Sequence, residues 1–134
     1  MRSAGRLAAA AVILAALASP AHAKIYVDLI LDSSGSMWGQ VRGRSRLLIM
    51  REAVRSIHRH ATDGVEIGIR TFAIQKQGPR TVQLLPIGDH GESTVRAALL
   101  EIVPRGQSEL VAALKGAARD FAGKDGKRVT DYYK

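Results

Sequence analysis

The chain has 134 residues, which is room for one domain, and it contains no cysteine. The absence of cysteine excludes disulfides, thiol catalysts and thiolate metal sites. Its formal net charge is +8, and the excess is concentrated in Arg42, Arg44, Arg46, Arg51, Arg55 and Arg59.

The first 23 residues have the composition of a secretory signal peptide. Arg2 and Arg6 precede an apolar run from Leu7 to Leu17, and Ala21-His22-Ala23 offers small residues for cleavage. The apolar run is shorter than the roughly 20 residues that cross a bilayer. We therefore expect a signal peptide at 1–23, no membrane span after its cleavage, and a periplasmic or secreted protein. Export and the scarcity of interleaved aromatic residues both argue against a nucleic-acid partner, so the basic residues are interpreted as a solvated helix surface.

The next segments predict a strand, a helix and a second strand. Ile25 to Leu31 is apolar apart from Asp28, which is typical of a strand buried on both faces of a parallel sheet. Asp28 could support a nearby site, but pairing with an arginine is favoured. A loop from Asp32 to Gly43 precedes an amphipathic helix, whose apolar residues are Leu47, Met50, Val54, Ile57 and Ala61. Val65 to Phe72 then alternates apolar residues with polar or small ones, as a strand should.

The remaining pattern completes an α/β fold. A shorter strand is expected at Thr81 to Leu85, then a short helix marked by Val95, Leu99 and Ile102. A longer helix follows, with Gly123 placed to cap it; the residues expected to share its apolar face are Leu110, Leu114, Ala117, Ala118 and Phe121. This order predicts a mostly parallel sheet covered by helices, with ligand sites at the carboxyl ends of its strands.

The loop after the first strand carries oxygen ligands at alternate positions, Asp32, Ser34 and Ser36. A carboxylate and hydroxyls with open positions suit Mg²⁺, which prefers octahedral oxygen coordination and retains water molecules. A polar turn in which these side chains cap the backbone explains the same spacing equally well.

Asp32-x-Ser34-x-Ser36, extended by Met37-Trp38-Gly39, resembles the metal-ion-dependent adhesion site of von Willebrand factor type A domains. The resemblance covers Lys24 to about Gly123 and includes the segment Pro104 to Leu110. It implies a Rossmann-like fold with helices on both faces of the sheet. It also implies a metal site formed by Asp32, Ser34, Ser36 and Ser108, where Ser108 stands in place of the family's threonine.

The sequence departs from the family near its end. The family's next ligand is an aspartate in a Thr-Asp-Gly turn, but Tyr132 follows Asp131 here, and the preceding strand would be too short to bring Asp131 to the site. We therefore interpret 24–134 as a partial domain, truncated at the C-terminus, whose first strand lacks a neighbour on one side. A remnant, or a sheet-incomplete subunit without independent metal or ligand binding, is the alternative interpretation.

The resemblance implies a binding protein. A bound Mg²⁺, with Mn²⁺ or Ca²⁺ as alternatives, would bridge to a carboxylate presented by a partner protein, and the basic helix would steer acidic partners. Trp38 would either contact that partner or pack the loop onto the domain, with packing favoured. We do not expect an enzyme, because the serine loop lacks a nucleophile elbow and the histidines show no spacing that implies a base or a zinc site. We expect His58, His60 and His90 to be solvated.

Overall fold

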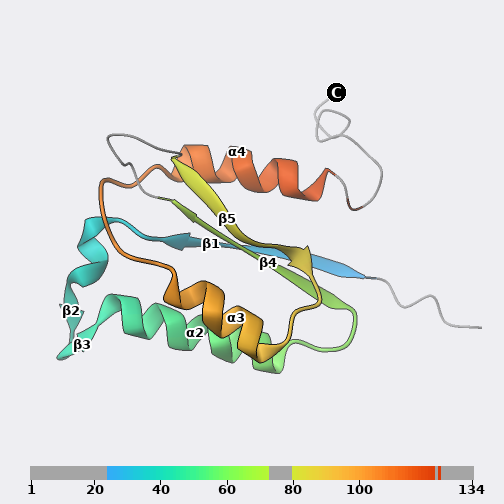
Figure 1. Cartoon of the computed structure of the whole chain (residues 1–134), viewed down its shortest axis with the longest axis horizontal. Helices are drawn as coiled ribbons and strands as arrows, with labels where there is room; N and C mark the ends of the chain where they lie inside the picture. Colours follow the sequence, from blue (N-terminus) through green and yellow to red (C-terminus); the bar gives the residue numbers. More distant parts are fainter. Residues whose placement is uncertain (1–23, 73–79, 123, 125–134) are drawn as a thin grey trace, which may run out of the picture.

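The structure is a computed structural model that describes residues 24–72, 80–122 and 124. The expectations for the signal peptide at 1–23, for Gly123 and for Asp131 lie outside the described residues. The elements, in chain order, are β1 (Ile25–Asp32), the 3-10 helix η1 (Gly35–Trp38), β2 (Gln40–Val41), β3 (Arg44–Ser45), α2 (Arg46–His60), β4 (Val65–Phe72), β5 (Thr81–Gly88), α3 (Glu92–Leu100) and α4 (Leu110–Phe121) (Figure 1).

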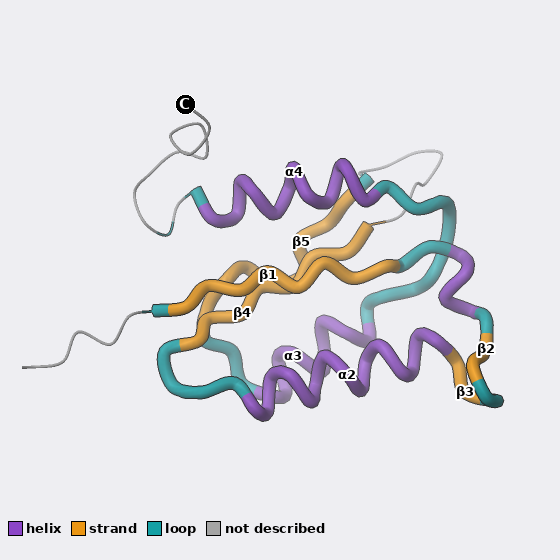
Figure 2. Tube along the Cα trace, turned by 180° about the vertical axis from the view of Figure 1, so that it is seen from behind, coloured by secondary structure: helices purple, strands orange, loops and turns teal. Residues whose placement is uncertain are grey.

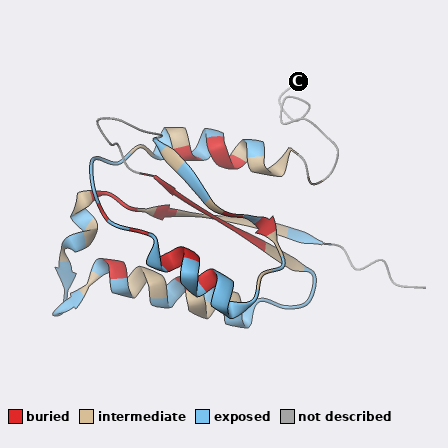
Figure 3. Ribbon diagram, viewed as in Figure 1, coloured by how far each residue is buried: buried red, intermediate tan, exposed pale blue. Residues whose placement is uncertain are grey.

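The main sheet has three strands in the order β1-β4-β5, and β4 is its central and most buried strand (Figure 3). β1 and β4 are parallel from Ile25↔Val65 to Asp32↔Phe72, because α2 provides the crossover between them. β5 runs antiparallel to β4. The segment 73–80 is too short for a crossover helix, so the polypeptide returns beside β4 in the opposite direction. The sheet is therefore mixed.

Helices cover both faces of this sheet. α4 lies on one face, and α2 and α3 lie side by side on the other, as the two opposite views show (Figures 1 and 2). The main apolar core lies between the sheet and the α2–α3 layer; its buried residues are Leu31, Leu47, Val54, Ile69, Leu85, Val95, Ala98, Leu99 and Ile102. The predicted α/β class and the predicted order of elements are confirmed. None of the described helices is long and apolar enough to cross a membrane.

β1 is less enclosed than its sequence predicts. It pairs with β4 on one side, and within the described part of the chain no strand lies along its other side. Most of its residues are consequently only half-buried. β5 is the other edge strand of this sheet, and it extends to Gly88, beyond the predicted end at Leu85. Pro86 is tolerated there because an edge strand can spare a backbone N–H donor.

α4 buries a different face from the one its leucines predict. Ala113, Gly116 and Ala117 face inward, whereas Leu110 and Leu114 are each about half exposed. The reason is the Arg70 side chain, which lies between β4 and α4. A Cβ atom at Gly116 would approach Arg70 Nη1 to 2.7 Å. Only a face of small residues can pack over that guanidinium group.

The region predicted as a loop from Asp32 to Gly43 is more ordered than expected. After η1, the two-residue strands β2 and β3 form an antiparallel hairpin in which Val41 pairs with Arg44. Its central residues, Arg42 and Gly43, both have positive φ angles of 51° and 76°, as a tight hairpin of this length requires. Arg44 therefore belongs to β3, and α2 begins at Arg46.

The apolar stripe of α2 is shorter than predicted. Leu47 and Val54 are buried and Met50 packs against the core. Ile57 and Ala61, at the end of the predicted stripe, are exposed.

Candidate metal site

The loop after β1 is held in a defined shape by its own hydrogen bonds. The Ser34 backbone N–H donates to Asp32 Oδ1 at 2.7 Å, which fixes the orientation of the carboxylate. The hydroxyl oxygens of Ser34 and Ser36 lie 2.9 Å apart and share a hydrogen bond. Ser34 is buried, Asp32 is half-buried and Ser36 is exposed. The three predicted ligands are therefore gathered on one tight turn that opens toward solvent at Ser36.

The spacing of these oxygens fits a small divalent cation. In an octahedral Mg²⁺ site with bonds of about 2.1 Å, neighbouring ligand oxygens lie about 3.0 Å apart. The separation of 2.9 Å between the Ser34 and Ser36 hydroxyls is that of an ordinary hydrogen bond, and it is also close to one edge of such an octahedron. Among the described residues, no group of three or more His, Cys, Asp or Glu side chains could hold a metal ion. A hydroxyl-rich oxygen set favours a hard cation.

Ser33 anchors the loop to the sheet. Its hydroxyl and its backbone N–H both donate to the Phe72 carbonyl at the end of β4, at 2.9 and 3.2 Å. Ser33 was not among the predicted site residues. Its position between two predicted ligands, at the end of a strand, is the signal that could have identified it. The anchor keeps the loop at the carboxyl edge of the two parallel strands.

A second loop, between α3 and α4, lies directly against the first. Arg105 N–H donates to Ser33 O at 2.9 Å, and Gly35 N–H donates to Gly106 O at 3.1 Å. Trp38 adds a third connection, because its indole Nε1–H donates to Pro104 O at 2.9 Å. η1 and the α3–α4 loop consequently run side by side at one end of the molecule (Figures 1 and 2).

Ser108 is the predicted ligand that lies farthest from the others in sequence. It is exposed and follows Gly106 by two residues, so its loop reaches the Asp32–Ser36 turn. Within the described segments, no hydrogen bond joins the Ser108 side chain to Asp32, Ser34 or Ser36. The structure thus brings three predicted ligands together and brings the loop of the fourth alongside them.

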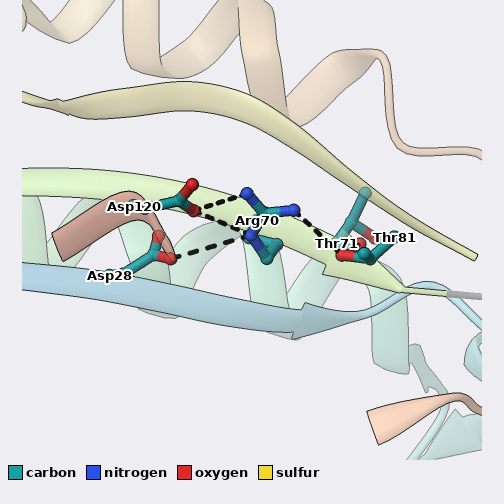
Figure 4. Close-up of polar contacts among 5 residues, drawn as sticks. All are labelled: Asp28, Arg70, Thr71, Thr81 and Asp120. Atoms are coloured by element: carbon teal, nitrogen blue, oxygen red, sulfur yellow. Dashed lines mark hydrogen bonds and ion pairs between the residues drawn. The ribbon is translucent and has the colours of Figure 1, made fainter. Parts of the chain in front are cut away.

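A buried ion cluster lies beneath α4, between the sheet and the helix (Figure 4). Arg70 Nε donates to Asp120 Oδ2 at 2.8 Å, and Arg70 Nη1 donates to Thr81 Oγ1 at 3.2 Å. Asp28 Oδ2 lies 3.9 Å from Arg70 Nε, so the predicted pairing of Asp28 with an arginine is confirmed. Asp120 was not among the predicted site residues. An arginine on a strand expected at the centre of the sheet is the signal that a buried acidic partner should exist.

The Asp28 carboxyl is the most enclosed member of this cluster. Its side chain is 1% exposed, and neither of its oxygens accepts a hydrogen bond from the described residues. Burial and the neighbouring Asp120 carboxylate raise the pKa of Asp28 to about 6, against the opposing effect of the Arg70 guanidinium. Arg70 pairs mainly with Asp120, whose Oδ2 lies 2.8 Å from Arg70 Nε, compared with 3.9 Å for Asp28 Oδ2.

Two of the four arginines of α2, Arg51 and Arg55, are less available to partners than the sequence suggests. Arg51 donates to the Leu99 and Ile102 carbonyls at 2.9 and 3.0 Å, and Arg55 forms an ion pair with Glu92 at 2.7 Å. Arg44, on β3, pairs with Glu52. These side chains join α2 to α3 or to the hairpin, so they act within the molecule.

His58 and His90 line a cavity of about 380 Å³ at the opposite end of the sheet from the serine loop. The expectation that the histidines are solvated holds for His60, which is exposed, whereas His58 and His90 are only half-buried. His58 Nε2 bonds to the His90 carbonyl at 2.6 Å, His60 Nδ1 to Ser56 O at 2.8 Å, and His90 Nε2 to Pro86 O at 2.7 Å. His58 therefore joins α2 to the loop that follows β5, whereas His60 and His90 bond to carbonyls four residues earlier in their own segments.

These observations define an α/β domain with a candidate cation site built from two loops at the carboxyl end of its parallel strands. A family model described as the von Willebrand factor type A domain matches residues 27–130. The chain belongs to the von Willebrand factor type A family. No match is found among the curated proteins.

Solved structures share the fold at low sequence identity. A mutant of the PilB minor pilin from Streptococcus sanguinis has a TM-score of 0.67 and 16% identity over 80% of this chain and 28% of its own. An aerotolerance-related membrane protein from Bacteroides fragilis has a TM-score of 0.64 and 24% identity over 77% of this chain and 49% of its own. Proximal thread matrix protein 1 from the mussel byssus was solved with zinc in its metal-ion-dependent adhesion site (MIDAS) motif. It has a TM-score of 0.58 and 15% identity, covering 78% of this chain and 26% of its own. The chain therefore spans less than half the length of each of these structures.

Proposed function

We propose that this chain is an exported adhesion domain that captures partner proteins through a divalent cation. Asp32, Ser34 and Ser36 hold Mg²⁺ together with Ser108, and a carboxylate of the partner completes the coordination. The domain binds its partner and performs no catalysis. One observation carries the proposal. The Asp32 carboxylate and the Ser34 and Ser36 hydroxyls, whose two oxygens lie 2.9 Å apart, are on one turn against the loop that precedes α4.

The arrangement of these groups supports a bridging role for the cation. Asp32 supplies the only carboxylate among the four proposed ligands, so the bound ion keeps much of its positive charge and attracts an anionic partner group. Ser36 is exposed, so the ion would be reached from solvent on that side. Fold relatives include a minor pilin and a membrane protein, which fits a protein that acts outside the cytoplasm.

Zinc is the principal competitor for the site. Proximal thread matrix protein 1 was solved with zinc in its corresponding motif. The oxygen-only ligand set of the present chain favours Mg²⁺, and Mn²⁺ or Ca²⁺ are the next candidates. Competition among Mg²⁺, Mn²⁺, Ca²⁺ and Zn²⁺ in one titration series would rank them.

The first test is metal binding by the purified protein, measured by isothermal titration calorimetry. Asp32→Ala removes the only carboxylate among the proposed ligands, so we expect Mg²⁺ affinity to fall at least about tenfold. Ser108→Ala should weaken binding by a smaller factor, because it removes one neutral oxygen. Partner capture from a secreted-protein fraction should fall with the metal affinity.

Asp89→Ala provides the matched control, because Asp89 is an exposed loop aspartate at the opposite end of the sheet. It should leave Mg²⁺ binding unchanged. Equal Mg²⁺ affinity in the native protein, Asp32→Ala and Asp89→Ala would contradict the proposed function.

A second candidate function follows from the open side of β1. Within the described residues β1 has a strand neighbour on one side only. The alternative is therefore a sheet-incomplete subunit that binds metal only after a further strand pairs with β1. A purified chain that melts cooperatively but takes up no Mg²⁺ would favour this candidate over the first.

A further inference from the structure

We infer that Trp38 forms an apolar contact surface beside the cation, which selects partner segments where an apolar side chain adjoins the coordinating carboxylate. This inference rests on the proposed function and deepens it by naming the partner's chemistry. It concerns a surface that none of the four proposed ligands provides.

The Trp38 ring combines exposure with a fixed position. Trp38 is 61% exposed, yet its indole Nε1–H donates a hydrogen bond to Pro104 O at 2.9 Å. The hydrogen bond satisfies the polar atom of the ring and leaves the apolar faces to solvent. A large aromatic ring that is already held in place loses little conformational entropy on binding, which is characteristic of interface anchors. The indole Nε1–H therefore ties the loop to the domain, as the sequence favoured, while the exposed faces of the ring remain open to a partner.

Trp38 lies on the same turn as a proposed metal ligand. η1 runs from Gly35 to Trp38 and carries Ser36 two residues before the tryptophan. A 3-10 helix rises about 2 Å per residue, so these two backbone positions are separated by about 4 Å along its axis. An extended partner strand advances about 3.3 Å per residue. Residues two apart on a 3-10 helix point about 120° away from each other, so a partner segment of a few residues, rather than a single side chain, would span the distance from the coordinating carboxylate to the indole ring.

The surroundings of Trp38 fit an acidic segment with apolar neighbours. Val103, beside the Pro104 that accepts the indole hydrogen bond, is 50% exposed and can extend the apolar surface. Arg105 and Arg42 are exposed, and within the described residues neither forms an ion pair. The local charge is therefore positive, which favours a partner segment with a net negative charge.

Two synthetic peptides test this selection: acetyl-Gly-Leu-Asp-Leu-Gly-amide, and the same peptide with serine in place of both leucines. The chain contains one tryptophan, so a change in its fluorescence reports on Trp38 alone. With saturating Mg²⁺, we expect the leucine peptide to shift the emission to the blue and to bind about tenfold more tightly than the serine peptide.

Variants compared by isothermal titration calorimetry assign that preference. Trp38→Ala should reduce the tenfold preference to less than about twofold while Mg²⁺ binding persists, and Trp38→Phe should retain part of it because the ring remains. Leu114→Ala removes an exposed apolar side chain from α4 and should change nothing.

Equal binding of the two peptides, no binding of either, or an unchanged preference in Trp38→Ala would overturn the inference. If Mg²⁺ still binds in those cases, the proposed metal site stands. Failure of the proposed function gives a different result. In that case the native protein would take up no Mg²⁺ and would behave like Asp32→Ala.

Discussion

At the scale of single residues, Asp28 shows the cost of placing a carboxyl group in the layer between the sheet and α4. It faces Arg70 from β4 and Asp120 from α4. Arg70 donates its short hydrogen bonds to Asp120 and lies 3.9 Å from Asp28. One cation therefore serves two buried carboxyls, and the less well paired one holds its proton to a higher pH.

This arrangement predicts a pH-dependent stability. The pKa of Asp28 is raised to about 6 in the folded protein from its ordinary 3.8. The protonated form therefore stabilises the fold, and this contribution is complete below pH 3.8 and lost as pH rises through 6. Asp28→Asn removes the titration, so its free energy of unfolding relative to the native protein should increase by about 2 kcal/mol between pH 4 and pH 7.5.

Urea unfolding at four pH values across that range measures this difference. Asp89→Asn, an exposed change of the same chemistry, should show no such trend. A constant difference, or one that falls as pH rises, would mean that Arg70 keeps Asp28 ionised in the folded protein.

At the scale of secondary-structure elements, α2 and α3 are joined by an arginine that satisfies the end of a helix. The last carbonyls of any helix lack partners within it. Arg51 of α2 donates to Leu99 O at 2.9 Å and to Ile102 O, just beyond α3, at 3.0 Å. Its planar guanidinium group can reach both acceptors, which a lysine ammonium group would do less well.

Arg51→Met should lower the free energy of unfolding by about 1–3 kcal/mol, because it leaves these carbonyls without their charged donor while retaining an apolar stem. Arg59→Met is the control on the same helix, since Arg59 is exposed and should cost less than about 0.5 kcal/mol. Urea denaturation midpoints compare the two variants. Equal midpoints would show that water replaces Arg51 at the end of α3.

At the scale of the whole molecule, a mixed three-stranded sheet lies between two helical layers, with β4 as its buried centre. β1 lies at one edge of the described sheet, and Ile25 at its start is 57% exposed. An apolar edge strand is a template for pairing with another strand. The same strand carries Asp32 at its end, so pairing at this edge would place a neighbour close to the candidate metal site.

We expect the melting temperature of the purified protein to rise with its concentration, because association along β1 stabilises the folded state by mass action. Ile25→Lys should reduce this dependence, since charged side chains discourage pairing at a sheet edge. Val111→Lys places the same charge on the exposed side of α4 and should not reduce it. Calorimetric scans over a tenfold concentration range test this, and a constant melting temperature in the native protein would contradict it.

The local pattern of the sequence was sufficient for the class of fold and for the serine loop. The alternation of residues 65–72 predicted β4, and the spacing of Leu47 and Val54 predicted the buried side of α2. Asp32, Ser34 and Ser36 are neighbours in sequence, so their convergence follows from a single turn. Each of these features depends on contacts within one segment, which is why periodicity and spacing reveal them.

Other features depend on which segments meet in space. The sequence shows that α4 has apolar residues, but only the packing of Arg70 beneath it explains why Gly116 turns inward and Leu114 outward. The sequence shows a tryptophan at position 38, but only the structure shows that a hydrogen bond to the Pro104 carbonyl holds its exposed ring in place. The sequence by itself therefore determined the longer helices and strands and the candidate ligands. The tertiary structure decided their orientation, because burial and hydrogen bonding between distant segments are set only when the layers pack.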